Sequence, residues 1–173
     1  MKQTKKIIIG IDPDIDKSGV AVLRLQTMEL EVSSQTFGEL IDFFRRGIYN
    51  PAETRVVVEA SWTTAHNFHL LPSDSKAVSA KKSYHVGRNH QCGIDICKLA
   101  ESEGLEVVKQ PPLRKCWKGK DRKITHDEIR IFTPLKKKRT NQEERDAILL
   151  AWTNAGLPTA TYYKFNINDF KKL

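Results

Sequence analysis

A short, strongly apolar segment near the start of the chain ends abruptly at an acidic residue. Residues 7–11 read Ile-Ile-Ile-Gly-Ile, and Asp12 and Pro13 follow directly. β-Branched residues favour strands, and a proline cannot take part in the hydrogen bonding of a strand interior. We therefore predict a buried strand over residues 5–12 with a carboxylate at its end. Such a carboxylate lowers stability unless a cation meets it, so this position constrains both the fold and the chemistry.

The rest of the sequence alternates short β-branched segments with segments of helical periodicity. Three strands come first, and their connections are too short for helical crossovers, so they predict an antiparallel meander. The whole order reads β-β-β-α-β-α-β-α-α, which predicts an α/β domain with a five-stranded mixed sheet flanked by helices. The predicted strands span residues 5–12, 20–25, 30–36, 55–60 and 105–109, and the predicted helices span about 40–46, 93–104, 125–132 and 142–155.

Two segments lack this periodicity and are long for connections inside a compact domain, which is typical of functional or disordered loops. Residues 61–85 are polar with scattered aromatic side chains, and residues 113–124 are rich in basic side chains around Trp117. The aromatic side chains Trp62, Phe68 and Tyr84 either stack on nucleic-acid bases or pack the loop itself.

The composition favours a basic protein with a polyanionic partner. Of 173 residues, 29 are Lys or Arg and 21 are Asp or Glu, so the formal net charge is +8. Nucleic acid is the commonest partner of such a surface. No apolar segment approaches the roughly 20 residues of a membrane span, and no signal peptide fits the first residues. Three cysteines without framework spacing favour a reduced, cytoplasmic location.

Acidic residues at the ends of predicted core elements indicate a metal site. Glu59 comes directly after three valines, and Glu143 and Asp146 lie three residues apart on one face of the last predicted helix. Divalent cations such as Mg²⁺ prefer carboxylate oxygens and would compensate these charges together with that of Asp12. Each acid alone could simply end a strand or interact with a helix N-terminus. Taken together, on strands that we expect to be neighbours, they favour the metal site.

A second candidate metal set is weaker. His85, His90, Cys92 and Cys97 fall close together in the sequence, but they lack the paired Cys-x₂-Cys spacing of structural zinc sites. We therefore expect Cys92 and Cys97 to pack on a helix, and we expect no zinc site here.

Several motifs, in the same order and at similar spacing, resemble those of RuvC-type Holliday junction resolvases. The opening Gly-Ile-Asp-Pro and the closing Asp-Ala-Ile-Leu-Leu-Ala are the more specific of them. The resemblance covers about residues 5–155 and is to divergent, phage-type members of that family. The segments that carry it are residues 6–13, 18–21, 56–59, 86–89, 105–117 and 146–151.

The resemblance implies an RNase H-like fold and a phosphodiester hydrolysis that depends on two Mg²⁺ ions about 4 Å apart, with Mn²⁺ able to substitute. It implies that Asp12 bridges the ions, that Glu59 binds one of them, and that Asp146 and Glu143 complete the set. The chain departs from the family where Asp14 replaces a usual glycine, and where Glu143 replaces a usual aspartate, so that Glu144 is an alternative fourth ligand.

Basic residues that follow the fifth predicted strand are the candidate phosphate contacts in this resemblance, and such contacts make binding strongly salt-dependent. A second basic run at residues 136–139 is either a solvated loop or a further contact. The candidate nucleic-acid-binding residues are Arg114, Lys115, Lys118, Lys120, Lys123 and His126.

The function that this reading predicts is the paired cleavage of four-way DNA junctions by a homodimer, whose two-fold symmetry suits the junction. Two alternatives remain: another RNase H-like nuclease that cuts RNA–DNA hybrids or branched DNA, and a nucleic-acid binder without catalysis. Actin-like ATPases share the opening motif but need two such domains around a nucleotide, so we expect no nucleotide cofactor. We expect residues 1–158 to form the nuclease domain and residues 159–173 a C-terminal tail.

Overall fold

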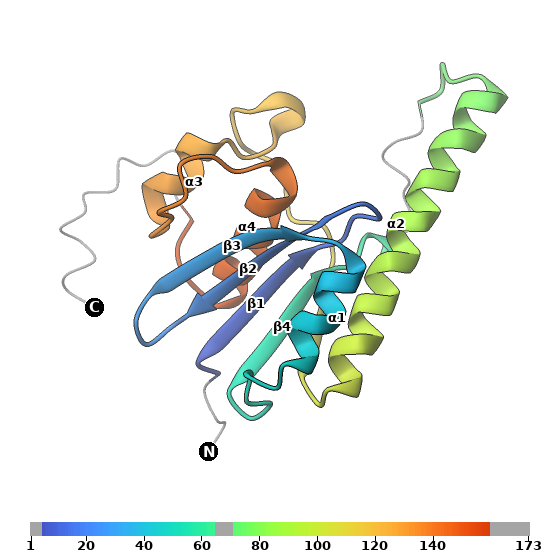
Figure 1. The fold of residues 1–173 in the computed structure, drawn as a ribbon. Coiled ribbons are helices and arrows are strands. Elements are labelled where there is room, and N and C mark those ends of the chain that lie inside the picture. Colours follow the sequence, from blue (N-terminus) through green and yellow to red (C-terminus); the bar gives the residue numbers. More distant parts are fainter. Residues whose placement is uncertain (1–4, 65–70, 160–173) are drawn as a thin grey trace.

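The computed structural model describes residues 5–64 and 71–159, and it shows one sheet with helices on both faces (Figure 1). The order of the strands in the sheet is β3-β2-β1-β4-β5. The strands are β1 (Ile7–Asp12), β2 (Ser18–Arg24), β3 (Glu29–Gln35), β4 (Thr54–Glu59) and β5 (Glu106–Gln110). The helices are α1 (Phe37–Arg45), α2 (Lys76–Ser102), α3 (His126–Phe132) and α4 (Gln142–Asn154), with short 3₁₀ turns η1 (Ser61–Thr63) and η2 (Lys120–Arg122).

The pairing of the strands places two acidic residues side by side. β1 pairs antiparallel with β2 and parallel with β4, and β4 pairs parallel with β5. Ile11 and Val58 are register partners, so Asp12 and Glu59 follow them at the same edge of the sheet. This mixed five-stranded sheet, with an antiparallel β1–β2–β3 meander, is the RNase H-like arrangement, and the predicted fold class is confirmed.

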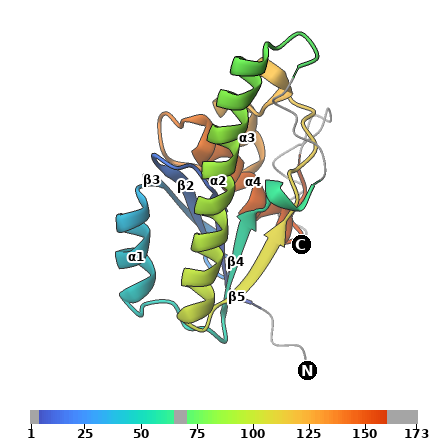
Figure 2. The ribbon, with the colours of Figure 1, turned by 90° about the vertical axis from the view of Figure 1, so that its right-hand side faces the viewer.

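Alternate residues of the central strands face two separate cores. Ile8 on β1 and Val57 on β4 pack with α3 and α4, whereas Ile9 and Val56 pack with α1 and α2. Figure 2 shows α1 and α2 in front of the sheet and α4 behind it. Because the strands are covered on both faces, their sequences read as continuous apolar runs.

Two glycines let α4 lie directly on the sheet. A Cβ atom added to Gly10 of β1 would overlap the carbonyl oxygen of Ala147, and one added to Gly19 of β2 would overlap the carbonyl oxygen of Glu143. The backbones of α4 and the strands are therefore in contact, with no room for a side chain between them. This contact holds the first turns of α4 beside the end of β1.

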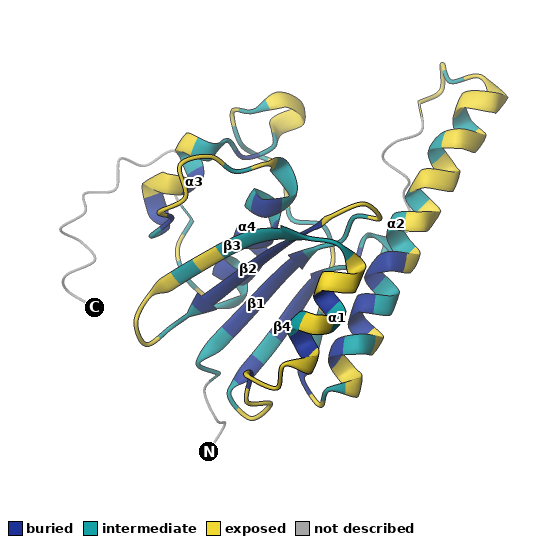
Figure 3. Cartoon of the chain, in the orientation of Figure 1, coloured by how far each residue is buried: buried dark blue, intermediate teal, exposed yellow. Residues whose placement is uncertain are grey.

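The predicted boundaries of α2 are wrong. We expected a helix over residues 93–104 after a long loop, but α2 begins at Lys76 and its cap residue Ser75 accepts a hydrogen bond from the Val78 amide. Figure 3 shows that its N-terminal half is mostly exposed, and its buried residues begin at Cys92. An apolar stripe arises only where a helix packs on a core, so this half carried no helical pattern.

The structure also places the cysteines and two of the aromatic side chains that the sequence singled out. Cys92 and Cys97 are buried on α2, as expected. Tyr84 lies exposed on α2, while Trp62 packs against Gly93 of α2 and the core on that face of the sheet. Phe68 and residues 160–173 of the predicted tail lie outside the described residues. Among the helices of the described ranges, none combines the length and apolar character that crossing a membrane requires.

We expect Gly10→Ala to lower the free energy of unfolding by about 1–3 kcal/mol, because the new methyl group must push α4 away from β1. Urea denaturation measures this change. Gly38→Ala on α1 is the matched control, since an added Cβ there meets nothing within 4 Å beyond its chain neighbours and the backbone of its own helix. That variant should be as stable as the parent or up to about 1 kcal/mol more stable. Equal stability of the two variants would contradict the close contact of α4 with the sheet.

Candidate active site

A cleft of about 330 Å³ opens where β1 and β4 end. The ends of these strands, α2, the segment between β5 and α3, and the first turns of α4 line it. All four acidic residues that the sequence analysis singled out, Asp12, Glu59, Glu143 and Asp146, line this cleft. Three elements that are far apart in the sequence thus bring the predicted set together.

Local structure explains how each acid is placed. Asp12 and Glu59 end neighbouring parallel strands. Asn141 caps α4 by accepting a hydrogen bond from the Glu144 amide at 2.8 Å, so Glu143 lies in the first helical turn and Asp146 one turn further on. The contact of Glu143 with Gly19 holds this turn against β2.

Burial, and in two cases the charge of a neighbouring acid, raises the pKa values of the acids in the cleft. The pKa of Asp12 is held well above its usual range, first by burial and then by the charges of Glu59 and Asp146, while Lys123 opposes the shift. Burial also raises the pKa of Glu59, to which the charge of Asp146 adds. Burial likewise raises the pKa of Asp146, against the opposing effect of Lys123. The charged forms of these carboxylates are therefore disfavoured in the cleft, and a bound cation would stabilise them.

The donor atoms of this cluster suit a hard divalent cation, because all four side chains offer carboxylate oxygens. In residues 5–64 and 71–159, however, no three His, Cys, Asp or Glu side chains converge closely enough to hold a metal ion as they stand. Asp146 Oδ1 accepts a hydrogen bond from Gln142 Nε2 at 2.9 Å, and Asp146 Oδ2 lies 4.0 Å from Lys123 Nζ. Binding would therefore require these side chains to rotate towards one another.

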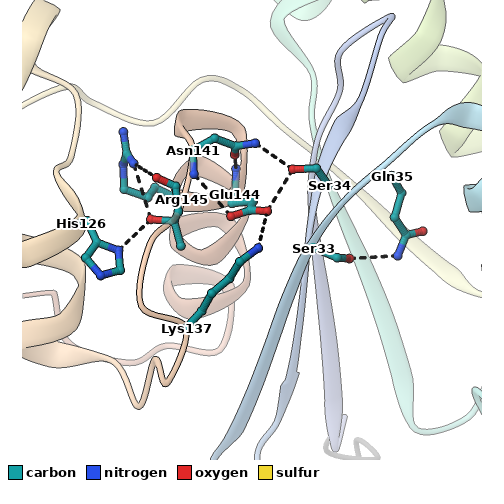
Figure 4. A network of polar contacts seen from close by, with 9 residues as sticks. Ser33, Ser34, Gln35, His126, Lys137, Asn141, Glu144 and Arg145 are labelled. Carbon is teal, nitrogen blue, oxygen red and sulfur yellow. Dashed lines mark hydrogen bonds and ion pairs between the residues drawn. The ribbon is translucent and has the colours of Figure 1, made fainter.

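Two further acids near the cleft are held by other contacts. Glu144 is buried and accepts hydrogen bonds from the Ser34 hydroxyl and from Lys137 Nζ (Figure 4). Glu143 lines the cleft and Glu144 does not. Asp14 does line it, but its carboxylate accepts hydrogen bonds from the Asp16 amide and from Asn89 Nδ2.

The predicted basic residues divide into two groups. Arg114, Lys115 and Lys123 line the cleft, whereas Lys118, Lys120 and His126 do not. The His126 ring nitrogen Nδ1 lies 2.9 Å from the Thr140 hydroxyl. Within the described part of the chain, the buried Nε2 of His126 has no hydrogen-bond partner.

The sequence analysis missed the contribution of α2 to the cleft. Asn89 and His90 line it, and Asn89 Oδ1 accepts a hydrogen bond from the Ile15 amide at 3.1 Å. Asn89 thereby ties α2 to the turn that follows Asp12. Residues 86–89 are one of the segments that resemble the family, and this was a signal in the sequence. Their position on a helix could not be predicted, because this part of α2 is mostly exposed and carries no apolar pattern.

We expect Asp12→Asn to raise the unfolding temperature in EDTA at neutral pH. The pKa of Asp12 is raised in the folded state, so the folded protein binds this proton more tightly than the unfolded chain does. The linked stability is present below the pKa of an unfolded aspartate, near 4, and is lost as the pH rises through the folded pKa. The variant removes that loss, so its unfolding temperature should rise by about 2–4 °C, which corresponds to about 1 kcal/mol in the free energy of unfolding.

The gain of Asp12→Asn should shrink as the pH falls towards 4, which thermal unfolding at several pH values measures. Asp42→Asn, an exposed position on α1, is the control and should change nothing. A lower unfolding temperature of Asp12→Asn at neutral pH would contradict the electrostatic repulsion described here.

Comparisons with known proteins give likenesses at the level of structure. No family model matches the chain, and no curated protein matches it significantly. The chain is similar to a Thermus thermophilus RuvC structure in complex with Holliday junction substrate, with 18% identity, 86% of this chain and 92% of that chain covered, and a TM-score of 0.48. It is also similar to a second Thermus thermophilus RuvC structure, with 16% identity and a TM-score of 0.46. That match covers 87% of this chain and 96% of the other.

Proposed function

We propose that this protein is a metal-dependent, structure-selective DNA endonuclease that resolves four-way junctions by paired phosphodiester hydrolysis. The observation that carries the proposal is the meeting of four carboxylates from β1, β4 and α4 in one cleft, in a chain of net charge +8. A basic surface attracts the polyanion, and the acidic cluster within it attracts the cation that phosphodiester hydrolysis needs.

Asp12, Glu59, Glu143 and Asp146 would hold the metal in this proposal. Mg²⁺ bound there, or Mn²⁺ in its place, would supply an activated water and stabilise the leaving oxygen. Asp12 would be the central ligand of this set, because it interacts electrostatically with all three other acids. Lys123 offsets the charge of Asp12, Glu59 and Asp146, and Arg114 and Lys115 at the cleft wall would hold the phosphodiester.

The junction is the proposed substrate because the motifs of the sequence resemble those of junction resolvases. A homodimer would present two such clefts, one for each of two opposed strands of a four-way junction. The same carboxylates would also cut an RNA–DNA hybrid or a fork, since substrate choice depends on surfaces outside the acidic cluster.

The direct test incubates the protein with labelled four-way junction, linear duplex, splayed fork and RNA–DNA hybrid, in Mg²⁺ and in EDTA. We expect paired nicks in the junction in Mg²⁺ only. Asp12→Asn and Asp146→Asn should each lower the cleavage rate at least about 100-fold, because each loses a ligand that stabilises the transition state. Asp42→Asn on α1 should cleave as the parent does.

The other outcomes distinguish the alternatives. Cleavage of hybrid or fork in place of the junction would keep the metal site and reject the substrate. Tight junction binding without cleavage of any substrate would reject the enzyme and favour a non-catalytic binder.

We also expect Lys115→Ala to weaken binding of the junction and to reduce its salt dependence. One phosphate contact fewer should lower the slope of log K against log salt by about 1. Fluorescence anisotropy measures this in an Asp12→Asn background, in which the substrate stays intact. Lys98→Ala on the far part of α2 is the control, since this exposed lysine does not line the cleft. Equal slopes for both variants would remove Lys115 from the interface.

A further inference from the structure

Glu144 is a buried acid that the proposed chemistry does not use. It is 3% exposed and lies in the first turn of α4, directly after Glu143 and two residues before Asp146. Burying a carboxylate is unfavourable unless hydrogen bonds and a counter-charge compensate it. The contacts that compensate the buried charge of Glu144 therefore lie directly beside two proposed metal ligands.

The contacts of Glu144 join three parts of the fold (Figure 4). Glu144 Oε1 accepts hydrogen bonds from the Ser34 hydroxyl at 2.9 Å and from Lys137 Nζ at 2.8 Å. Asn141, the cap of α4, donates from Nδ2 to the Ser34 oxygen at 2.8 Å. Edge strand β3, the segment before α4 and the first turn of α4 are thus tied together. We call Ser34, Lys137, Asn141 and Glu144 the α4 anchor.

The α4 anchor acts at the place where α4 touches the sheet. Ser34 on β3 is the register partner of Gly19 on β2. The backbone of Glu143 lies on Gly19, and the side chain of the next residue, Glu144, bonds the neighbouring Ser34. Two consecutive helical residues therefore hold the first turn of α4 at two adjacent points of the sheet.

Apolar contacts alone would define the position of the first turn of α4 on the sheet less well. The buried apolar residues of α4, from Ala147 onwards, lie beyond the first turn, and the glycines of the sheet offer no side chains to pack against. Hydrogen bonds are directional, so the α4 anchor defines where the first turn ends up along the strands. The carboxylates of Glu143 and Asp146 move with this turn.

We propose that Glu144 is a positioning residue, whose bonds to Ser34 and Lys137 set Glu143 and Asp146 in place for a divalent cation while Glu144 itself stays outside the metal site. This inference rests on the proposed function, because it concerns the same site. It also assigns Lys137, one of four basic residues at 136–139, to the α4 anchor and not to nucleic acid.

The test measures Mn²⁺ binding by isothermal titration calorimetry, with the protein alone and no DNA. Glu144→Gln keeps the size of the side chain but removes its charge. It should lower the affinity for Mn²⁺ about tenfold, because a group that orients the metal ligands is lost. The stoichiometry of binding should not change. Lys137→Met should have the same effect, and the double variant should be little worse than either single one. Lys137→Arg should restore the affinity.

A matched control separates positioning from simple loss of helix capping. Glu39 of α1 occupies the same place in a capping box, with Thr36, as Glu144 does with Asn141. Glu39→Gln should reduce stability and leave Mn²⁺ affinity unchanged. If Glu144→Gln does not fold, Lys137→Met and Ser34→Ala carry the test, since both leave Glu144 in place.

The outcomes separate the α4 anchor from the proposed function. Parental affinity in Glu144→Gln and Lys137→Met overturns the positioning role and leaves the metal site standing. A reduced stoichiometry in Glu144→Gln, with Lys137→Met unaffected, overturns it as well and makes Glu144 a ligand. Absence of Mn²⁺ binding by the parent overturns the proposed metal site itself, and the role of the α4 anchor with it.

Discussion

The direct contact between the backbone of α4 and the central strands is the constraint on which the site depends. Gly10 and Gly19 leave no side chain between helix and sheet, so the first turns of α4 reach the end of β1. Any larger residue at either position would move Glu143 and Asp146 away from Asp12 and Glu59. The packing of the core and the geometry of the candidate site therefore depend on the same two glycines.

That close approach brings together groups that repel one another. Burial raises the pKa values of Asp12, Glu59 and Asp146, repulsion from neighbouring acids adds to the shifts of Asp12 and Glu59, and nearby Lys123 offsets only part of the effect. A chain that only had to fold would be more stable with neutral side chains here. A local loss of stability of this kind is typical of functional sites, where the side chains that the reaction needs are kept although they destabilise the fold.

The success of the sequence analysis followed the degree of burial. The strands and α4 are packed on both sides or along one full face, so their apolar pattern indicated their positions within one or two residues. The first half of α2 contains no buried residue and so carries no apolar pattern, and the sequence analysis therefore assigned residues 76–85 to a loop and began the helix at residue 93. With that half misplaced, the contribution of Asn89 and His90 to the cleft could not be foreseen.

The sequence by itself determined the mixed sheet, the neighbouring positions of Asp12 and Glu59, and the common face of Glu143 and Asp146, because period and strand order decide these. Only the tertiary structure decided which of Glu143 and Glu144 lines the cleft. Consecutive helical residues point about 100° apart, and which of the two faces the cleft depends on how the helix is rotated on the sheet. Gly19 and Ser34 set that rotation through contacts across more than a hundred residues of chain, which no local pattern records.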